Sequence, residues 1–191
     1  MCSINVINAI NKARLYDYNF LDDVTERHKF REQAIFAEKC LSKEERTTAL
    51  QFLNKNYDYK KVLYNDGKRR TCENCSQKCL ATLYCEHCIR NYFVKNFSNW
   101  TSGNNYIDNL IQKCQMESLA PDRIVEWIPY NNLQNVKFLT KGGCSEIYLG
   151  EWMEGRCIEW DISKRQLKRF GKMKVILKKL ENKRWLNEVR D

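Results

Sequence analysis

The sequence predicts an α+β protein in which helices come first, a small cysteine-rich module follows, and antiparallel strands make up the last third. Three observations support this order. Apolar residues recur at helical spacing before residue 65, five cysteines fall between positions 72 and 88, and short β-type runs separated by glycine-containing turns follow residue 135. The predicted organisation is a helical segment over 1–65, a cysteine-rich module with flanking helices over 66–120, and an antiparallel sheet over 130–191.

The composition indicates a soluble globular protein of a reducing compartment. The chain has 191 residues, 43% hydrophobic and 30% charged, with seven Gly and two Pro, which is typical of a soluble globular chain. It contains no run of 18 apolar residues, and its start lacks the apolar core of a secretory signal, so we expect neither a membrane span nor export. Ten cysteines without such a signal indicate a reducing compartment, the cytoplasm or the nucleus, where paired thiols are more often metal ligands than disulfides.

The first 65 residues predict a helical hairpin that packs on itself or on a neighbour. Apolar residues at steps of three and four predict one amphipathic helix between residues 24 and 41: Phe30, Ala34, Ala37 and Leu41. Ser42 and Glu45 form an S-x-x-E capping box that opens a second helix, which continues through Ala49, Leu50 and Leu53. No catalytic residue is visible in this segment.

Further elements follow the cysteines. Two short amphipathic helices are predicted, the first from Ile89, Phe93 and Phe97 and the second from Ile107, Leu110, Ile111 and Cys114. Four β-type runs occupy 136–139, 147–152, 157–160 and 175–180, and a last helical stretch covers 184–190.

The cysteine cluster has the spacing of a metal site. Cys72-x-x-Cys75 and Cys85-x-x-Cys88 are two knuckles separated by nine residues, and each can direct two thiolates at one tetrahedral ion about 2.3 Å away. Four soft sulfur ligands select Zn²⁺ and leave no open coordination position, so we predict a structural zinc ion in a zinc-ribbon-like module. The metal would fold a segment that is too small to hold itself together.

Other roles for the cysteines stay open. Cys79 is a fifth thiol that could replace a ligand, as could His87. Disulfides, ordinary buried thiols and thioredoxin-type redox catalysis are the alternatives, although neither C-x-x-C lies in the strand-then-helix setting that redox catalysis requires. The scattered thiols are expected to be small buried hydrophobes: Cys2, Cys40, Cys114, Cys144 and Cys157.

The last third carries three features in a fixed order. Gly142-Gly143 lies between two β-type runs. A strand with an inward lysine is predicted over Val175-Ile176-Leu177-Lys178, and Glu188 lies on the next helical stretch. Together they resemble the opening of a protein kinase domain, in which a glycine-rich loop, a strand lysine and a helix αC glutamate follow one another. The resemblance implies that residues 130–191 form an incomplete kinase N-lobe, from its first strand to a partial αC.

From about Arg70 onward, the chain resembles a fungal group of kinase-like proteins more specifically. In that group, a pair of C-x-x-C knuckles precedes N-F-x-N-W-T-S-G-N, E-W-I-P-Y and a tyrosine-kinase-like catalytic domain. Here these blocks are residues 96–104 and 126–130. The resemblance covers roughly the last 120 residues, and several separated blocks match in register.

The resemblance implies an ATP site made of Gly142, Gly143, Ile147, Lys178 and Glu188. Gly142 matches the second loop glycine and Ile147 the valine that caps the base, while Lys178 matches the lysine that pairs the phosphates and Glu188 its partner. Thr140 and Ser145 stand at the first and third glycine positions, and Ile176 replaces an alanine beside the base, so ATP binding is predicted to be weak. A simple hairpin turn and a solvated lysine are the rival interpretations of Gly142-Gly143 and Lys178.

Catalysis is not expected from this chain alone. Phosphoryl transfer needs an H-R-D-x-x-x-x-N loop and a D-F-G aspartate, whereas the histidines here are His28 and His87, and Phe170-Gly171 follows Arg169. Fewer than sixty residues follow Gln134, against roughly 250 for a kinase domain. We therefore predict a noncatalytic kinase-family fragment whose partners are other proteins, including kinase-family chains.

The alternative function is a zinc module that binds another protein or nucleic acid. Aromatic residues near Lys78, Arg90 and Lys95 could stack on bases, or could instead form the core around the zinc: Tyr84, Tyr92, Phe93, Phe97 and Trp100. The formal net charge of +9 does not favour nucleic acid, because residues 164–191 hold 11 Lys and Arg against 3 acidic residues and supply nearly all of the excess.

Overall fold

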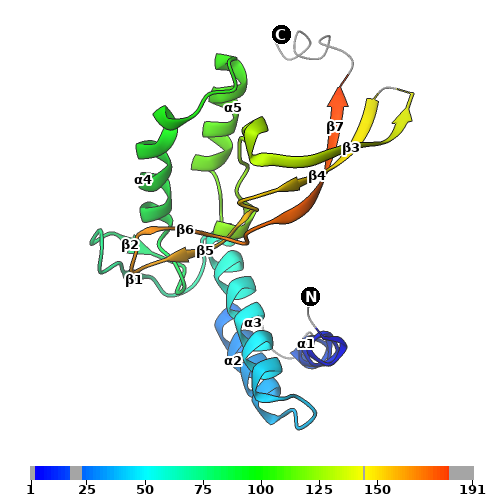
Figure 1. Cartoon of the computed structure of the whole chain (residues 1–191). Coiled ribbons are helices and arrows are strands. Elements are labelled where there is room, and N and C mark those ends of the chain that lie inside the picture. The colour runs from blue at the N-terminus through cyan, green and yellow to red at the C-terminus, as the bar shows by residue number, and fades with distance from the viewer. Residues whose placement is uncertain (1–2, 18–22, 144, 181–191) are drawn as a thin grey trace. The chain divides into compact units, whose positions relative to one another are not determined.

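The computed structural model of the chain describes residues 3–17, 23–143 and 145–180 (Figure 1). These residues form five α-helices and small antiparallel sheets, which confirms the predicted mixture of helix and sheet. The chain divides into two compact units, Met1–Tyr92 and Phe93–Asp191. This division differs from the predicted ranges because residues 66–92 lie with the helices of the first unit. None of the described helices is long and apolar enough to cross a membrane.

Three helices pack together at the start of the first unit: α1 (Ile4–Asp17), α2 (Val24–Ala37) and α3 (Lys43–Tyr64). Their core consists of apolar side chains: Val6, Ala9, Ile10, Ala13, Ile35, Leu41, Ala49 and Leu53. Half of these belong to α1, which was not predicted as a separate element. Its buried positions recur at steps of three, one and three, the helical periodicity that would have revealed it.

The helix predicted between residues 24 and 41 is shorter than expected. It ends at Ala37, since Glu38 adopts an extended conformation, yet Leu41 in the following loop is still buried in the core. The side chain of Arg46 donates hydrogen bonds to the carbonyl oxygens of Glu38, at 2.9 Å, and of Leu41, at 3.5 Å. The buried residue of α2 is Ile35, and Ala34 packs against the core as predicted, whereas the predicted Ala37 is exposed.

The predicted capping box at the start of α3 is confirmed. The backbone N–H of Glu45 donates to Ser42 Oγ at 3.1 Å, and the N–H of Ser42 donates to the Glu45 carboxylate at 3.0 Å. Two N–H groups at the helix start thus gain acceptors, which fixes where the helix begins. At the other end, Asn65 adopts the left-handed conformation that commonly terminates a helix.

The cysteine-rich part of the first unit is a pair of very short strands followed by a helix. Strand β1 (Arg70–Thr71) pairs antiparallel with β2 (Lys78–Cys79), and α4 (Glu86–Asn96) begins directly after Cys85. The unit boundary falls inside α4. A 3-10 turn, η1 (Phe97–Asn99), continues α4 into the second unit.

The second unit contains one more helix and the sheets. Helix α5 (Asn105–Met116) is followed by the 3-10 turns η2 (Pro121–Arg123) and η3 (Tyr130–Asn132). Strands β3 (Leu133–Gly142), β4 (Ser145–Trp152) and β7 (Met173–Leu180) form an antiparallel sheet in the order β3-β4-β7. Between β4 and β7 the chain forms a separate hairpin of β5 (Cys157–Asp161) and β6 (Gln166–Arg169), of which β6 was not predicted.

The base of the β5–β6 hairpin is closed by two glycines. Gly171 donates its N–H to the carbonyl of Glu154 at 2.9 Å, and Gly155 has φ +65°. A Cβ atom on Gly155 would lie 2.0 Å from the carbonyl oxygen of Gly171. Beside them, Arg169 donates to the Gly155 carbonyl at 2.8 Å and to the Glu126 carboxylate at 2.5 Å. Only glycine fits at position 155, because the left-handed backbone and the close approach both exclude a side chain.

Candidate functional site

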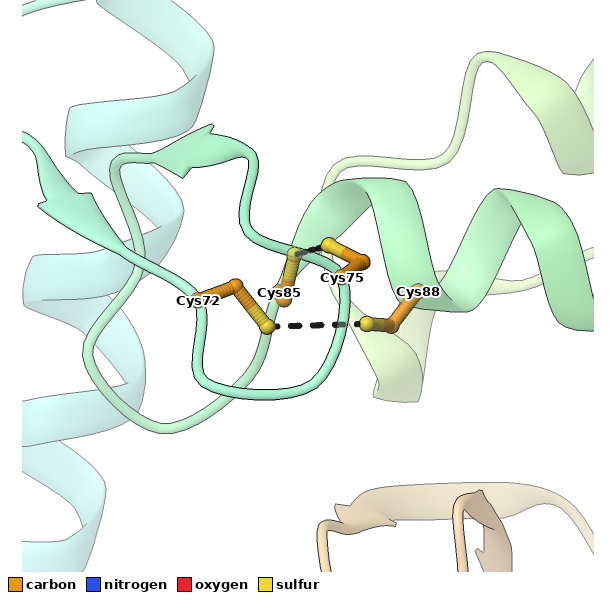
Figure 2. A group of neighbouring side chains, drawn as sticks. All are labelled: Cys72, Cys75, Cys85 and Cys88. Atoms are coloured by element: carbon orange, nitrogen blue, oxygen red, sulfur yellow. Dashed lines mark hydrogen bonds between the residues drawn. The ribbon is translucent and has the colours of Figure 1, made fainter.

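The four cysteines predicted as metal ligands lie together in the first unit. Their sulfur atoms are all within 4.8 Å of one another. Figure 2 shows two of the pairs, Cys72 with Cys88 and Cys75 with Cys85, each with a sulfur–sulfur distance of 3.6 Å. A disulfide needs about 2.05 Å, whereas four sulfurs placed 2.3 Å from a tetrahedral ion are separated by about 3.8 Å. The spacing therefore fits a metal site and not a disulfide.

Backbone hydrogen bonds shape the first knuckle. The N–H of Ser76 donates to the carbonyl of Cys72, and the N–H of Cys72 donates to the carbonyl of Gln77, both at 2.9 Å. Ser76 has φ +58°, which turns the chain sharply after Cys75. The turn brings both thiols of the knuckle onto one side of the loop (Figure 2).

The second knuckle lies at the start of α4. Cys85 immediately precedes the helix and accepts the Ile89 N–H through its carbonyl, while Cys88 lies within the first turn. Helical geometry therefore sets the spacing of these two sulfurs. The side-chain amide of Asn74 donates to Cys88 Sγ at 3.3 Å and connects the two knuckles.

The thiols of the cluster differ in acidity. Burial raises the pKa of Cys72, but hydrogen bonds from the backbone N–H groups of Cys75 and Asn74 outweigh that effect and lower its pKa to about 7. Burial raises the pKa of Cys85 and of Cys88. Four thiolates thus become stable together in this buried place only when a cation supplies compensating positive charge.

The fifth thiol, Cys79, lies beside the cluster and not within it. Its sulfur, that of Cys85 and a carboxylate oxygen of Glu86 are within 4.8 Å of one another. Cys79 is 1% exposed, and burial raises its pKa. His87 directs Nε2 toward the carbonyl oxygen of Lys78, at 3.2 Å. The four-cysteine set is therefore complete without either alternative ligand.

Two side chains hold the loop between the knuckles. Glu86 accepts hydrogen bonds from the N–H groups of Leu80, at 2.9 Å, and Ala81, at 3.0 Å. Arg70 donates from the opposite direction to the carbonyl oxygens of Ala81, at 2.8 Å, and Tyr84, at 2.6 Å. These four hydrogen bonds hold the backbone of the loop before any ion is considered.

A fully buried carboxylate connects the same loop to α3. Asp58 is 0% exposed and accepts three hydrogen bonds, from the N–H and Oγ1 of Thr82, both at 2.8 Å, and from the N–H of Leu83 at 2.7 Å. Hydrogen bonds to an ionised carboxylate are stronger than those between neutral groups. The order of the cysteine loops is therefore coupled to the position of α3.

In the second unit, the predicted phosphate loop is the hairpin between β3 and β4. Gly142 lies opposite Ser145 in the strand register. Neither Gly142 nor Gly143 has a positive φ, and a Cβ atom on Gly143 would meet nothing within 4 Å. The turn itself therefore does not require glycine at position 143.

The sheet register brings two of the other predicted residues together. Ile147 on β4 lies directly opposite Lys178 on β7, and Leu149 lies opposite Ile176. Because side chains alternate along a strand, all four share one face of the sheet. Ile176 is 61% exposed and Lys178 is also exposed, so this face is open. Glu188 and the helical stretch predicted over 184–190 lie outside the described residues.

The aromatic residues that could form a stacking surface are partly internal. Tyr84 is 4% exposed and Phe93 is 6% exposed, so neither ring can receive a base. Tyr92, Phe97 and Trp100 are half-buried.

The scattered cysteines do not share one environment. Cys157 is buried, and burial raises its pKa to about 12, whereas Cys40 is exposed and Cys114 is half-buried. Cys2 and Cys144 lie outside the described residues. Burial of all these thiols was therefore the wrong prediction for Cys40.

No protein-family model matches the sequence, and no curated protein or solved structure gives a significant match. The kinase-like resemblance rests on the motifs quoted from the sequence alone. The metal site rests on the geometry of its sulfur atoms.

Proposed function

We propose that the chain is a protein-kinase-like protein that acts by binding and not by phosphoryl transfer. It would combine a structural zinc module with a sheet that resembles an ATP-binding N-lobe. The single observation that supports the kinase-like part best is the pairing of Ile147, on β4 directly after the Gly142-Gly143 hairpin, with Lys178 on β7. In a kinase N-lobe, the glycine-rich loop and the valine that follows it cover the nucleotide, and a lysine on a later strand pairs the phosphates.

The zinc part of the proposal assigns Cys72, Cys75, Cys85 and Cys88 as the ligands. Four sulfur donors at tetrahedral spacing favour Zn²⁺, and a fully protein-ligated ion stabilises a fold without taking part in a reaction. We expect about one zinc per chain in the purified protein. Metal analysis that finds none, with every thiol of the native protein reacting freely, would contradict this assignment.

The nucleotide part predicts weak binding. Thr140 and Ser145 place side chains where the kinase loop has glycines, which crowds the approach of phosphate oxygens to the backbone. Ile176 adds bulk where the base would lie. The same face carries Lys178, whose ammonium would attract the phosphates as a point charge.

An ATP analogue with an acyl-phosphate group tests this site, because it transfers its acyl group to a lysine held near the phosphates. We expect Lys178 to be labelled, and an excess of ATP to reduce that labelling. Lys174 lies on the same strand and, at a spacing of four residues, on the same face, so it is the matched control whose labelling ATP should leave unchanged. Equal labelling of Lys174 and Lys178 without competition by ATP would refute the nucleotide part and leave the zinc part standing.

A further inference from the structure

The three helices of the first unit enclose a pocket that the zinc and nucleotide proposals do not use. Its volume is about 190 Å³. Four basic side chains from all three helices line it: Arg14 of α1, Arg27 and Arg31 of α2, and Lys60 of α3. Asn56 and Tyr57 add further polar groups. Basic residues far apart in the sequence are therefore brought to one concavity by the packing of the bundle.

The charged side chains that line this pocket are all basic or His28. Among the residues that the structure describes, none of those lining the pocket is acidic. Carboxylates also lie close to the lining residues, Glu32 and Asp58 near His28 and Asp23 near Arg27. Several cations converging on a concave wall produce a positive potential that attracts an anion.

The wall of the pocket is held in place by ring contacts. The rings of His28 and Tyr57 stack with centroids 4.0 Å apart and planes inclined by 2°. Tyr57 is fixed in turn by a 3.1 Å hydrogen bond from its hydroxyl to Thr25 Oγ1. The guanidinium of Arg14 lies 5.5 Å from the centre of the Phe52 ring. A rigid wall loses little conformational entropy when a ligand binds.

We propose that this pocket binds a phosphate group. Guanidinium and ammonium groups only donate hydrogen bonds, so they match the acceptor oxygens of a phosphate and would repel a metal ion. A pocket of about 190 Å³ is smaller than the roughly 300–1,000 Å³ of drug-sized ligand sites, so it suits a small anion and not a stretch of nucleic acid. The ligand is inorganic phosphate or a phosphate monoester, which share the same dianionic oxygens.

Calorimetric titration of the zinc-loaded full chain tests the site, with sodium chloride used to keep the ionic strength constant. Inorganic phosphate is the first probe and phenyl phosphate the second. We expect saturable binding, and a loss of at least about tenfold in affinity in Arg27→Gln. Lys29→Gln is the matched control, since Lys29 is exposed on the same helix and does not line the pocket. Its affinity should stay within about twofold of the unmodified chain.

The two probes distinguish the sources of the phosphate. Tighter binding of phenyl phosphate would assign a monoester, and tighter binding of inorganic phosphate would assign the free ion. Arg14→Gln provides a second variant if Arg27→Gln fails to fold, as judged by circular dichroism. The proposal is overturned if binding does not saturate below about 20 mM, or if Lys29→Gln loses as much affinity as the pocket variants.

Discussion

The cysteine cluster of the first unit and the sheet face that carries Ile147 and Lys178 in the second differ in how many of their groups the structure brings together. All four cysteine sulfurs of the cluster lie among described residues, within 4.8 Å of one another, and hydrogen bonds of Asn74 and Glu86 hold the segments around them. On the sheet, Ile147 and Lys178 are paired, but Lys178 is exposed and the turn at Gly143 is open. The cysteine cluster is therefore formed by contacts within the chain. The exposed sheet face would form a binding site only when a ligand or another segment covers it.

The largest effect should come from removing one sulfur ligand. Cys85→Ser breaks the tetrahedral set, and structural zinc contributes roughly 10 kcal/mol or more to the folding of small modules. We expect loss of the metal and loss of amide hydrogen-exchange protection over residues 70–92. Cys40→Ser, at an exposed cysteine outside the cluster, should retain both.

Amide hydrogen exchange of a sheet variant gives the comparison with the cysteine cluster. Lys178→Ala removes an exposed side chain, so protection of β4 and β7 should stay as it is in the unmodified chain. If Cys85→Ser keeps its metal and its protection, the cluster is not the structural centre that we describe.

A second contrast compares two glycines of the second unit. Gly155→Ala should destabilise this unit by about 3 kcal/mol, because its φ is +65° and the new Cβ would overlap the Gly171 carbonyl. Gly143→Ala should change the free energy of unfolding by less than about 0.5 kcal/mol, since the added atom enters open space. Urea unfolding followed by the fluorescence of the tryptophans measures both. Equal effects in the two variants would mean that the hairpin base is not constrained as described.

Replacing the buried Asp58 carboxylate of α3 should have a smaller effect on the free energy of unfolding of the first unit. Asp58→Asn replaces one acceptor oxygen by an N–H donor, so at least one of the hydrogen bonds from Thr82 and Leu83 is lost. We expect a cost of about 2 kcal/mol in the zinc-loaded protein, measured by urea unfolding. Glu73→Gln removes an exposed carboxylate near the first knuckle and should be nearly neutral. A neutral Asp58→Asn variant would show that α3 and the cysteine loops are not coupled through this group.

The smallest effect is a pH dependence at His28. Burial lowers its pKa in the folded chain below the ordinary value of 6.5. The unfolded chain therefore binds more protons just below that value, and the free energy of unfolding falls as the pH drops from 6.5 toward the lower folded pKa. Unfolding at about pH 7.5 and 5.5 should show a steeper loss in the unmodified chain than in His28→Gln. Equal slopes would contradict the burial of a neutral imidazole.

The sequence predicted those parts of the molecule that depend on short spacing. The spacing of the two C-x-x-C pairs predicted which four cysteines lie together, and Ser42 with Glu45 predicted a helix start. In each of these motifs the interacting groups lie within a few residues. The strands that carry Ile147 and Lys178 were also predicted, because their β-type runs are local.

The supporting residues could not be predicted from the same sequence. Asp58 acts on a loop 24 residues away, and nothing in the helical pattern of α3 distinguishes it from an acid on the solvent face. Arg70 and Glu86 act through backbone groups, which have no sequence signature. The end of α2 was missed because the buried Leu41 continues the apolar period after the helix has ended.

X-ray absorption at the zinc edge tests the assignment of the four cysteines as zinc ligands, because it counts the atoms bound to the metal in the intact protein. We predict four sulfur neighbours at about 2.3 Å and no nitrogen or oxygen neighbour. Three sulfurs with one nitrogen would point to His87 as a ligand and contradict the assignment of all four cysteines. A metal-free protein with sulfur–sulfur bonds would contradict the zinc site itself.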